Sequence, residues 1–294
     1  MLEFKEIEFS DKDRIENALK ASDFMGCEYT FANNMAWRRL ADSKICFYKN
    51  FYIVCAFCGG IPVFVFPSGS GDMTELITEM KRFSDSFGCP LKISGVTENS
   101  LKMMYELFPD MFTAELDRDG CDYIYLQNDL AELSGKKFHG KRNHLAKFNR
   151  LDYVYSPITK NDLDECILFV TQKFNDESPA DHSSLAEQFA MNTYFSHFDR
   201  LSLSGGIIRI GGKIAALTVG ERLNSNTFCV HIEKADRSFD GIYAAVNNFF
   251  ARSAMNGFTY VNREEDLGIE GLRKAKLSYH PAFLLKKYII TFNL

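Results

Sequence analysis

One order of secondary structure occurs twice along this chain of 294 residues. Alternating apolar runs between turn residues predict strands, and apolar residues at helical spacing predict helices, as over Met73 to Phe87. Each half begins with a strand, Leu2 to Phe9 or Tyr153 to Ser156, followed by two helices, three strands, a helix, a strand, a short helix and a strand. This repeat of architecture predicts an α+β fold of two domains, each with a mixed, largely antiparallel sheet flanked by helices.

The boundary between the two domains is predicted after residue 134. The first half ends within Phe112 to Gln127, which predicts a pair of strands around the turn Arg118-Asp119-Gly120. Basic residues begin directly after this pair. We therefore predict an N-terminal scaffold domain over residues 1–134 and a C-terminal domain over residues 135–294 that carries the site.

The stretch from Phe258 to Tyr288 concentrates charges of both signs. It predicts a strand, an acidic turn, a short helix over Gly268 to Leu277 and a last strand over Lys286 to Asn293. A helix that only packs would show a wider apolar stripe. We expect the acidic turn to bind a substrate's ammonium group and the helix to meet its phosphate or stabilise an oxyanion, with a structural salt-bridge network as the alternative. The residues concerned are Glu265, Asp266, Arg273 and Lys276.

This stretch also resembles a known family. The C-terminal catalytic region of bacterial lysylphosphatidylglycerol synthases, and the soluble proteins that share it, have a signature similar to Asn262 to Gly268 (NREEDLG) and Gly271 to Tyr279 (GLRKAKLSY) with Pro281. Phe138 to Phe148 and Tyr29 to Arg38 extend the resemblance over nearly the whole chain. The resemblance implies two acetyltransferase-like (GNAT) domains in tandem, related to transferases that add amino acids to cell-wall precursors.

The resemblance also implies a class of reaction. We expect an acyl- or aminoacyl-transferase that uses a small-molecule or lipid-headgroup acceptor bearing an amine or hydroxyl. Aminoacyl-tRNA is the preferred donor, and no other cofactor is assigned. Two alternatives stay open: an acyl-CoA N-acyltransferase, and a catalytically silent module that binds a nucleotide or small ligand.

The loop before the predicted helix Gly241 to Met255 bears on the choice of donor. In the acetyltransferase fold, the N-terminus of this helix binds the pyrophosphate of the donor. Acetyl-CoA enzymes use R/Q-x-x-G-x-G/A there, whereas this loop offers Arg237 and Gly241 without a second glycine, and Asp240 would face the phosphates. The loop favours a donor other than CoA, although an ordinary turn that needs Gly241 for its backbone angle fits equally well.

His231 and Glu233 alternate along a predicted strand and are expected to share one face. Either would serve as general base if it faces a cleft, and a buried hydrogen-bonded pair is the alternative. We expect that cleft between the strand ending near Glu233 and the strand ending near Asn262, where separating strands leave backbone groups free for a ligand.

A basic segment, Lys136 to Arg150, contains six Lys or Arg and no acid in a chain of net charge −5. It predicts either a helix that faces a polyanion such as tRNA, or a solvated helix face with Leu145 and Phe148 buried. His139 and His144 are five residues apart and do not share a helical face, so no metal site is predicted.

The eight cysteines lack the spacing of a disulfide framework. The N-terminus shows no secretion signal, so we expect reduced thiols in a cytoplasmic protein. Cys55 and Cys58 match C-x-x-C, but they lie in a predicted strand rather than at a helix N-terminus, which favours core packing over a redox role. The longest apolar run, Phe51 to Phe66, contains Gly59-Gly60 and Pro62 and predicts a β-hairpin rather than a membrane span.

These interpretations together define the predicted site. The residues predicted to be catalytic are Glu265, Asp266, Glu233 and His231. The residues predicted to bind donor or substrate are Arg237, Gly241, Asn262, Arg273, Lys276, Tyr279, Lys141 and Arg142.

Overall fold

The structure, a computed structural model, describes residues 2–177 and 182–293. Its contacts divide the chain into two compact units. One contains residues 1–122, 265–268 and 285–294, and the other contains residues 123–264 and 269–284. This division differs from the predicted single boundary after residue 134, because the first unit includes segments from both ends of the chain.

The first unit is built on a sheet in the order β1-β2-β3-β5-β14-β6, with β4 paired to β2. The pair β3–β5 is parallel, and the other pairs are antiparallel. Its strands are β1 (Lys44–Tyr48), β2 (Phe51–Cys58), β3 (Ile61–Val65), β4 (Ser68–Gly69), β5 (Lys92–Thr97), β6 (Phe112–Leu116) and β14 (Lys287–Phe292). Its helices are η1 (Phe9–Asp11), α1 (Lys12–Ser22), α2 (Phe31–Trp37), α3 (Met73–Ser86) and α4 (Glu98–Leu107).

The predicted hairpin over Phe51 to Phe66 is confirmed as the antiparallel pair β2–β3. The predicted first strand, Leu2 to Phe9, is wrong, because this segment forms only a single bridge between Lys5 and Ile45. None of the described cysteines forms a disulfide bond, and all of them except Cys89 are buried. The side chain of Cys58 lies outside the described residues.

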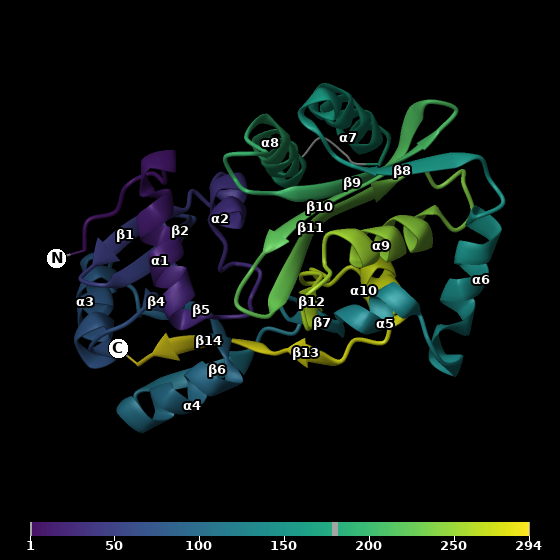
Figure 1. Ribbon diagram of the computed structural model, residues 1–294. Coiled ribbons are helices and arrows are strands. Elements are labelled where there is room, and N and C mark those ends of the chain that lie inside the picture. The colour runs from purple at the N-terminus through teal and green to yellow at the C-terminus, as the bar shows by residue number, and fades with distance from the viewer. Residues whose placement is uncertain (1, 178–181, 294) are drawn as a thin grey trace. The chain divides into compact units, whose positions relative to one another are not determined.

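The last strand of the chain, β14, lies between β5 and β6 in the sheet of the first unit (Figure 1). Tyr288 is opposite Val96 on one side and Leu116 on the other. Ile290 and Phe292 belong to the apolar core of this unit. The strand predicted for the C-terminal domain therefore completes the first sheet.

The second unit is built on a sheet in the order β13-β7-β12-β11-β10-β9-β8. The pair β11–β12 is parallel, and the pairs β7–β12, β10–β11, β9–β10 and β8–β9 are antiparallel. Its strands are β7 (Asp122–Leu126), β8 (Tyr153–Pro157), β9 (Ser204–Ile210), β10 (Lys213–Arg222), β11 (Thr227–Ala235), β12 (Tyr260–Asn262) and β13 (Phe283–Leu285). Its helices are α5 (Gln127–Glu132), η2 (Lys136–Phe138), α6 (His139–Phe148), η3 (Lys160–Asp162), α7 (Leu163–Glu177), α8 (His182–Ser196), α9 (Ile242–Ser253) and α10 (Glu270–Leu277).

The strands β6 and β7, predicted as one pair, belong to different sheets. β6 pairs with β14, whereas β7 pairs with β12, where Tyr125 is opposite Val261. Tyr123 and Tyr125 are buried in an apolar cluster with Phe250 of α9. The turn at residues 118–120 therefore connects two sheets instead of closing a hairpin.

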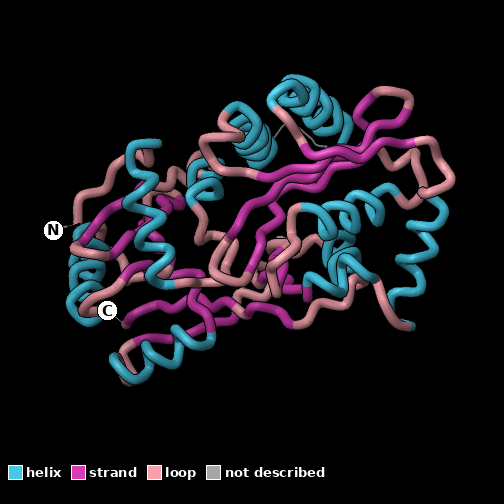
Figure 2. The backbone as a smooth tube through the Cα atoms, in the orientation of Figure 1, coloured by secondary structure: helices cyan, strands magenta, loops and turns pink. Residues whose placement is uncertain are grey.

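Helices cover both faces of the strands β8 to β11 in the second unit (Figure 1, Figure 2). α7 and α8 lie on one face, and α9 lies on the other. Phe148 of α6 and Val246 of α9 share an apolar cluster with Ile208 of β9. Within the described parts of the chain, no helix has both the length and the apolar character needed to cross a membrane.

A β-bulge interrupts β11 in the middle of its pairing with β10. Ile232 is opposite Val219, but Val230 is opposite Gly220, so His231 is an extra residue in β11. A bulge of this kind re-aims the side chains that follow it, because the alternation of faces is broken at the inserted residue.

The bulge turns two predicted site residues to opposite faces of the sheet. His231 stacks on Tyr194 of α8, with ring centroids 5.2 Å apart. Glu233 instead accepts a hydrogen bond from the Asn247 side chain of α9. The prediction that His231 and Glu233 share one face is therefore wrong.

Candidate functional site

The strands β11 and β12 separate at one end of their short pairing. They pair from Thr227–Tyr260 to Cys229–Asn262, where β12 ends, while β11 continues to Ala235. Among the described residues, no strand pairs with the remainder of β11 on this side. This opening, called the fork below, was predicted from the sequence, and it exposes backbone groups to the side chains around it.

The fork contains a buried ion pair between Arg263 and Glu233. Arg263 Nη2 lies 2.9 Å from Glu233 Oε1, and the two side chains are 12% and 13% exposed. Asn247 Nδ2 donates to the other oxygen of Glu233 at 3.2 Å. Arg263 Nη1 and Asn247 Oδ1 are buried and have no hydrogen-bond partner among the described residues. Buried polar atoms are normally paired, so these two atoms are an unsatisfied donor and an unsatisfied acceptor in the fork.

Tyr279 places a second cation beside Arg263. Lys141 Nζ lies 3.7 Å and Arg263 Cζ lies 4.7 Å from the centre of the Tyr279 ring. Lys141 also donates to Ser278 Oγ at 2.7 Å. Burial, and then repulsion by Arg263, lower the pKa of Lys141 to about 8, although Glu233 acts in the opposite direction. An amine with this pKa is mostly protonated at pH 7, and roughly one tenth of it is neutral there.

Two predicted binding residues contact the backbone of the turn after β12. Lys276 Nζ donates to the backbone oxygen of Arg263 at 2.6 Å, and Lys276 is buried. Asn262 is buried, and its Oδ1 accepts from the backbone N–H of Glu264 at 2.7 Å. These contacts hold Arg263 in place. Arg273 of α10 is half-buried.

The predicted catalytic carboxylates Glu265 and Asp266 belong to the first unit. Asp266 is completely buried and accepts from Arg118 at 3.2 Å and from the backbone N–H of Gly268 at 3.0 Å. Glu265 Oε2 accepts from the Cys27 thiol at 3.3 Å. For Asp266, the contacts fit the structural salt-bridge alternative.

A buried charged cluster in the first unit was not predicted. Lys287 Nζ lies 2.8 Å from Asp122 Oδ1 and 2.7 Å from Glu28 Oε2. Burial opposes a charged lysine, but Asp122, Cys27, Glu28 and Glu265 outweigh burial and raise the pKa of Lys287 well above its ordinary value. The signal for this cluster in the sequence is Lys287 itself, a single charged residue at the start of an otherwise uncharged strand, because a buried lysine needs a counterion.

The N-terminus of α9, expected to bind a donor pyrophosphate, is closely packed against α6. Gly241 is the N-cap of α9 with φ of +85°, and a Cβ there would overlap the carbonyl oxygen of His144. Lys147 of α6 also pairs with Asp240 at 2.9 Å. Arg237 is exposed. Gly241 is therefore needed for its backbone angle and for the close approach of α6.

The basic segment on η2 and α6 is partly structural and partly exposed. Arg142 donates to the backbone oxygens of Leu133 and Gly135. Lys136 and Arg150 are exposed, and they form no ion pair with any described residue. The burial of Phe148 fits the solvated-face alternative, while the exposed cations leave the polyanion prediction open.

His231 lies between two carboxylates. Its Nδ1 is 2.8 Å from Glu264 Oε1, its Nε2 is 2.9 Å from Glu221 Oε1, and its side chain is 1% exposed. Burial alone would lower the pKa of His231, but Tyr194, Cys229 and Glu221 outweigh burial and raise it well above its ordinary value. The sequence analysis missed Glu221 and Glu264 because neither lies near His231 in sequence.

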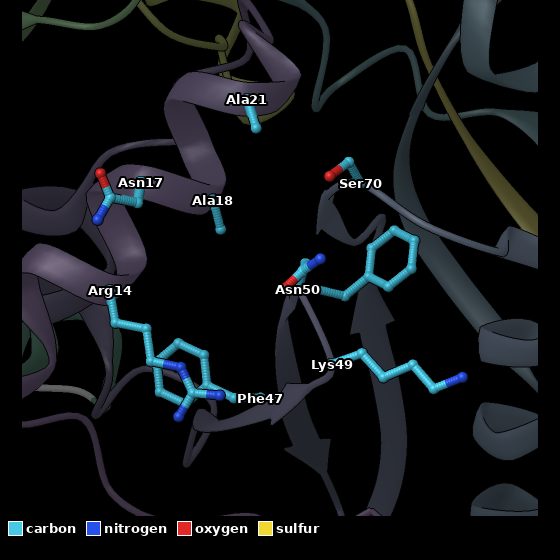
Figure 3. A pocket seen from close by; sticks show the side chains of 9 residues that line it. Arg14, Asn17, Ala18, Ala21, Phe47, Lys49, Asn50 and Ser70 are labelled. Atoms are coloured by element: carbon cyan, nitrogen blue, oxygen red, sulfur yellow. The ribbon is translucent and has the colours of Figure 1, made fainter.

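The first unit has a surface pocket of about 240 Å³ beside α1 (Figure 3). The guanidinium of Arg14 lies 3.9 Å from the centre of the Phe47 ring. The lining side chains include no carboxylate and none of the residues that the sequence predicts for the site.

Comparison with known proteins places this fold and site in a family. Residues 20–291 match the family described as phosphatidylglycerol lysyltransferase, C-terminal. The chain belongs to this family. The resemblance predicted from the sequence is therefore confirmed.

Solved structures agree with this assignment. A conserved protein of unknown function from Bacteroides thetaiotaomicron is 38% identical, with a TM-score of 0.93 and 100% of both chains covered. The structure of L-PGS from Bacillus licheniformis is 17% identical, with a TM-score of 0.67 over 98% of this chain and 94% of that one. FemX is 9% identical, with a TM-score of 0.60 over 99% and 97%. These last two show the fold. A tandem GNAT protein from the clavulanic acid biosynthesis pathway is 10% identical, with a TM-score of 0.53 over 100% of this chain and 99% of that one, which confirms the predicted tandem acetyltransferase-like architecture.

A curated relative matches part of the chain. An uncharacterized protein of Mycoplasmoides gallisepticum is 27% identical over 173 residues. The match covers 58% of this chain and 55% of that protein. The chain therefore matches about half the length of this relative.

Proposed function

We propose that this protein is an aminoacyltransferase that moves an aminoacyl group from a charged tRNA to an amine or hydroxyl acceptor at the fork. The family and the fold support a transferase in general, because the matched family is described by a lysyltransferase and similar folds include FemX and a tandem GNAT protein. The choice of donor comes from the site.

The packing of α6 on α9 is the observation that supports aminoacyl-tRNA as the donor. CoA-dependent enzymes with this fold bind the pyrophosphate of the donor at the N-terminus of the helix that corresponds to α9. At this position the backbone of His144 lies against Gly241, and Asp240 places a carboxylate beside it. An aminoacyl-tRNA ester needs no pyrophosphate site there. This observation favours aminoacyl-tRNA over acyl-CoA.

The fork supplies groups for acyl transfer. The acceptor's nitrogen or oxygen attacks the ester carbonyl carbon, and Arg263 Nη1 donates to the oxyanion that forms. Neutral Lys141 accepts the proton of the acceptor and returns it to the ribose oxygen as the ester bond breaks. Glu233 fixes the guanidinium through its 2.9 Å ion pair.

The exposed cations of the basic segment supply a surface for tRNA. Lys136 and Arg150 are exposed at the two ends of the segment that also carries Lys141. Phosphate contacts of this kind give affinity without sequence specificity. Lys141 lies on α6, between the exposed cation of η2 and the one that follows α6.

Binding and transfer measurements test the proposal. Filter retention of charged and uncharged tRNA is compared with calorimetric titration of acetyl-CoA. Transfer is then followed with labelled aminoacyl-tRNA, using phosphatidylglycerol vesicles or a panel of water-soluble amines as acceptors. We expect retention of charged tRNA, transfer to one acceptor class and no heat from acetyl-CoA. Micromolar affinity for acetyl-CoA would overturn the proposal in favour of the acyl-CoA alternative.

A variant of Arg263 separates catalysis from binding. Arg263→Lys keeps the positive charge but replaces the forked guanidinium with a single ammonium nitrogen, so separate nitrogens can no longer serve Glu233 and the oxyanion. We expect transfer to fall by about 10²–10³-fold, as for removal of one oxyanion donor, with tRNA retention unchanged. Unchanged transfer would remove Arg263 from the reaction.

A further inference from the structure

Three potential metal ligands converge where β11 and β12 separate. Cys229 Sγ lies 3.8 Å from His231 Nδ1, and Glu264 Oε1 lies 2.8 Å from the same nitrogen. All three ligand atoms lie within 4.8 Å of one another. In a tetrahedral zinc site with bonds of about 2.0–2.3 Å, the ligand atoms lie roughly 3.3–3.8 Å apart. The separation of Cys229 Sγ from His231 Nδ1 fits this spacing, and Glu264 Oε1 must move away from Nδ1 by roughly half an ångström to bind the same ion.

The imidazole of His231 is held by a carboxylate on its other side. Nε2 lies 2.9 Å from Glu221 Oε1, and an ionised carboxylate can only accept a hydrogen bond. The same argument applies to Glu264 at Nδ1, so a neutral His231 can donate to only one of the two carboxylates. In the tautomer with its hydrogen on Nε2, the Nδ1 lone pair is directed toward Cys229 and Glu264. Metal-binding histidines commonly have this carboxylate on the ring nitrogen that does not bind the metal.

In this tautomer two acceptors face each other across 2.8 Å, the lone pair of Nδ1 and the carboxylate of Glu264. A cation must stabilise this contact, either a second proton on the imidazole or a metal ion. The sulfur of Cys229 beside the same nitrogen favours the metal ion. A proton needs one acceptor, whereas thiolate, imidazole and carboxylate together form a zinc-type set of ligands.

The fold holds these side chains in place. One residue separates Cys229 from His231 in β11, and Cys229 is completely buried. Glu264 adopts the left-handed region at φ of +58°, which non-glycine residues seldom adopt unless other contacts compensate. The ring of Tyr194 covers His231, and its hydroxyl is buried without a hydrogen-bond partner among the described residues. This hydroxyl is a further polar group beside the cluster.

We propose that Cys229, His231 and Glu264 bind one divalent transition-metal ion of the zinc type. Glu221 orients His231 for this role. Three protein ligands leave a fourth position for a water molecule or a substrate atom, as in zinc sites that bind small molecules. The proposal does not rest on the transferase activity, because its test measures metal binding alone.

The metal content of the purified full chain tests the proposal. Protein dialysed against a chelator is titrated with Zn²⁺ and with Co²⁺. We expect one bound ion per chain and, with Co²⁺, a charge-transfer absorption band from the thiolate ligand. A folded protein that binds no stoichiometric ion and gives no such band would overturn the proposal. The cluster would then be a Glu–His–Glu hydrogen-bond network around a protonated imidazole.

Variants identify the ligands. Cys229→Ser should abolish the charge-transfer band, and Glu221→Gln should lower the affinity for the metal by about 10–100-fold while keeping the band. Cys166→Ser changes another buried cysteine of the second unit, and as the matched control it should alter neither property. Circular dichroism of the metal-free proteins establishes that each variant folds. If Cys229→Ser does not fold, the wild-type titration and Glu221→Gln still decide the question. A band that survives in folded Cys229→Ser would also contradict the assignment.

Discussion

The carbonyl oxygen of His144 occupies the place where a side chain on Gly241 would begin. Gly241 also has φ of +85°, in the left-handed region that favours glycine. Two helices of the second unit, α6 and α9, therefore meet at a position that tolerates only a hydrogen atom.

Gly241→Ala should destabilise the protein by at least about 2 kcal/mol, since backbone strain and overlap with the His144 carbonyl add together. The free energy of unfolding in urea measures this change. Gly140→Ala is a matched control, because a Cβ on Gly140 meets nothing within 4 Å and φ there is not positive. The control should be neutral or stabilising by up to about 1 kcal/mol. Equal effects of the two substitutions would contradict the packing described for α6.

The pKa of Lys141, lowered to about 8 by burial and by Arg263, predicts a pH dependence of stability. The unfolded chain has an ordinary lysine, with a pKa near 10.4, so it binds more protons than the folded chain between about pH 8 and 10.4. The contribution of Lys141 to stability should therefore rise with pH across this window. Urea unfolding of the wild type and Lys141→Met at several pH values measures it. A difference in stability that stays constant from pH 7 to 10 would show that the pKa is not lowered.

The ion pairs of Lys287 predict a large loss of stability when this lysine is removed. Lys287→Met leaves Asp122 and Glu28 buried without their cation, and breaking a buried pair in this way costs about 3–5 kcal/mol. The neighbouring Lys286 pairs with Glu98 at the surface, where both side chains are about half-exposed, so Lys286→Met should change stability by less than about 1 kcal/mol. Thermal or urea unfolding compares the two variants at one pH. A small effect of Lys287→Met would mean that these carboxylates are protonated in the folded protein.

The basic segment predicts a salt-dependent interaction with tRNA. Lys136→Glu combined with Arg150→Glu should weaken retention of tRNA and reduce the dependence of log K on log salt concentration by about 1 for each lost phosphate contact. Both residues are exposed, so the free energy of unfolding should change by less than about 0.5 kcal/mol.

A matched control changes the same net charge elsewhere. Lys92→Glu combined with Lys102→Glu alters two exposed lysines of the first unit. This control should retain tRNA with nearly the wild-type affinity. An equal loss of tRNA retention in the two double variants would show that the basic segment is a solvated helix face without a specific role in tRNA binding.

The sequence by itself determined the local structure and the family. The helix Met73–Ser86 follows from apolar residues at helical spacing after the capping residue Asp72, whose side chain accepts from the backbone N–H of Glu75. The hairpin β2–β3 follows from Gly59 and Gly60, which both have positive φ. These features depend on neighbours a few residues apart, so a linear pattern reveals them. The fork also followed from the sequence, through the order of elements and the resemblance to a fold that contains it.

Only the tertiary structure decided which segments meet. Nothing in the apolar pattern of β14 indicates that it inserts between β5 and β6, or that β7 leaves β6 for the second sheet. One inserted residue at His231 places Glu233 on the opposite face of the sheet. Lys287 contacts Cys27, which lies 260 residues away in the sequence. Strand partners and buried ion pairs depend on which long-range contacts satisfy every buried hydrogen bond and charge together, and this requirement acts on the whole fold rather than on any local run of residues.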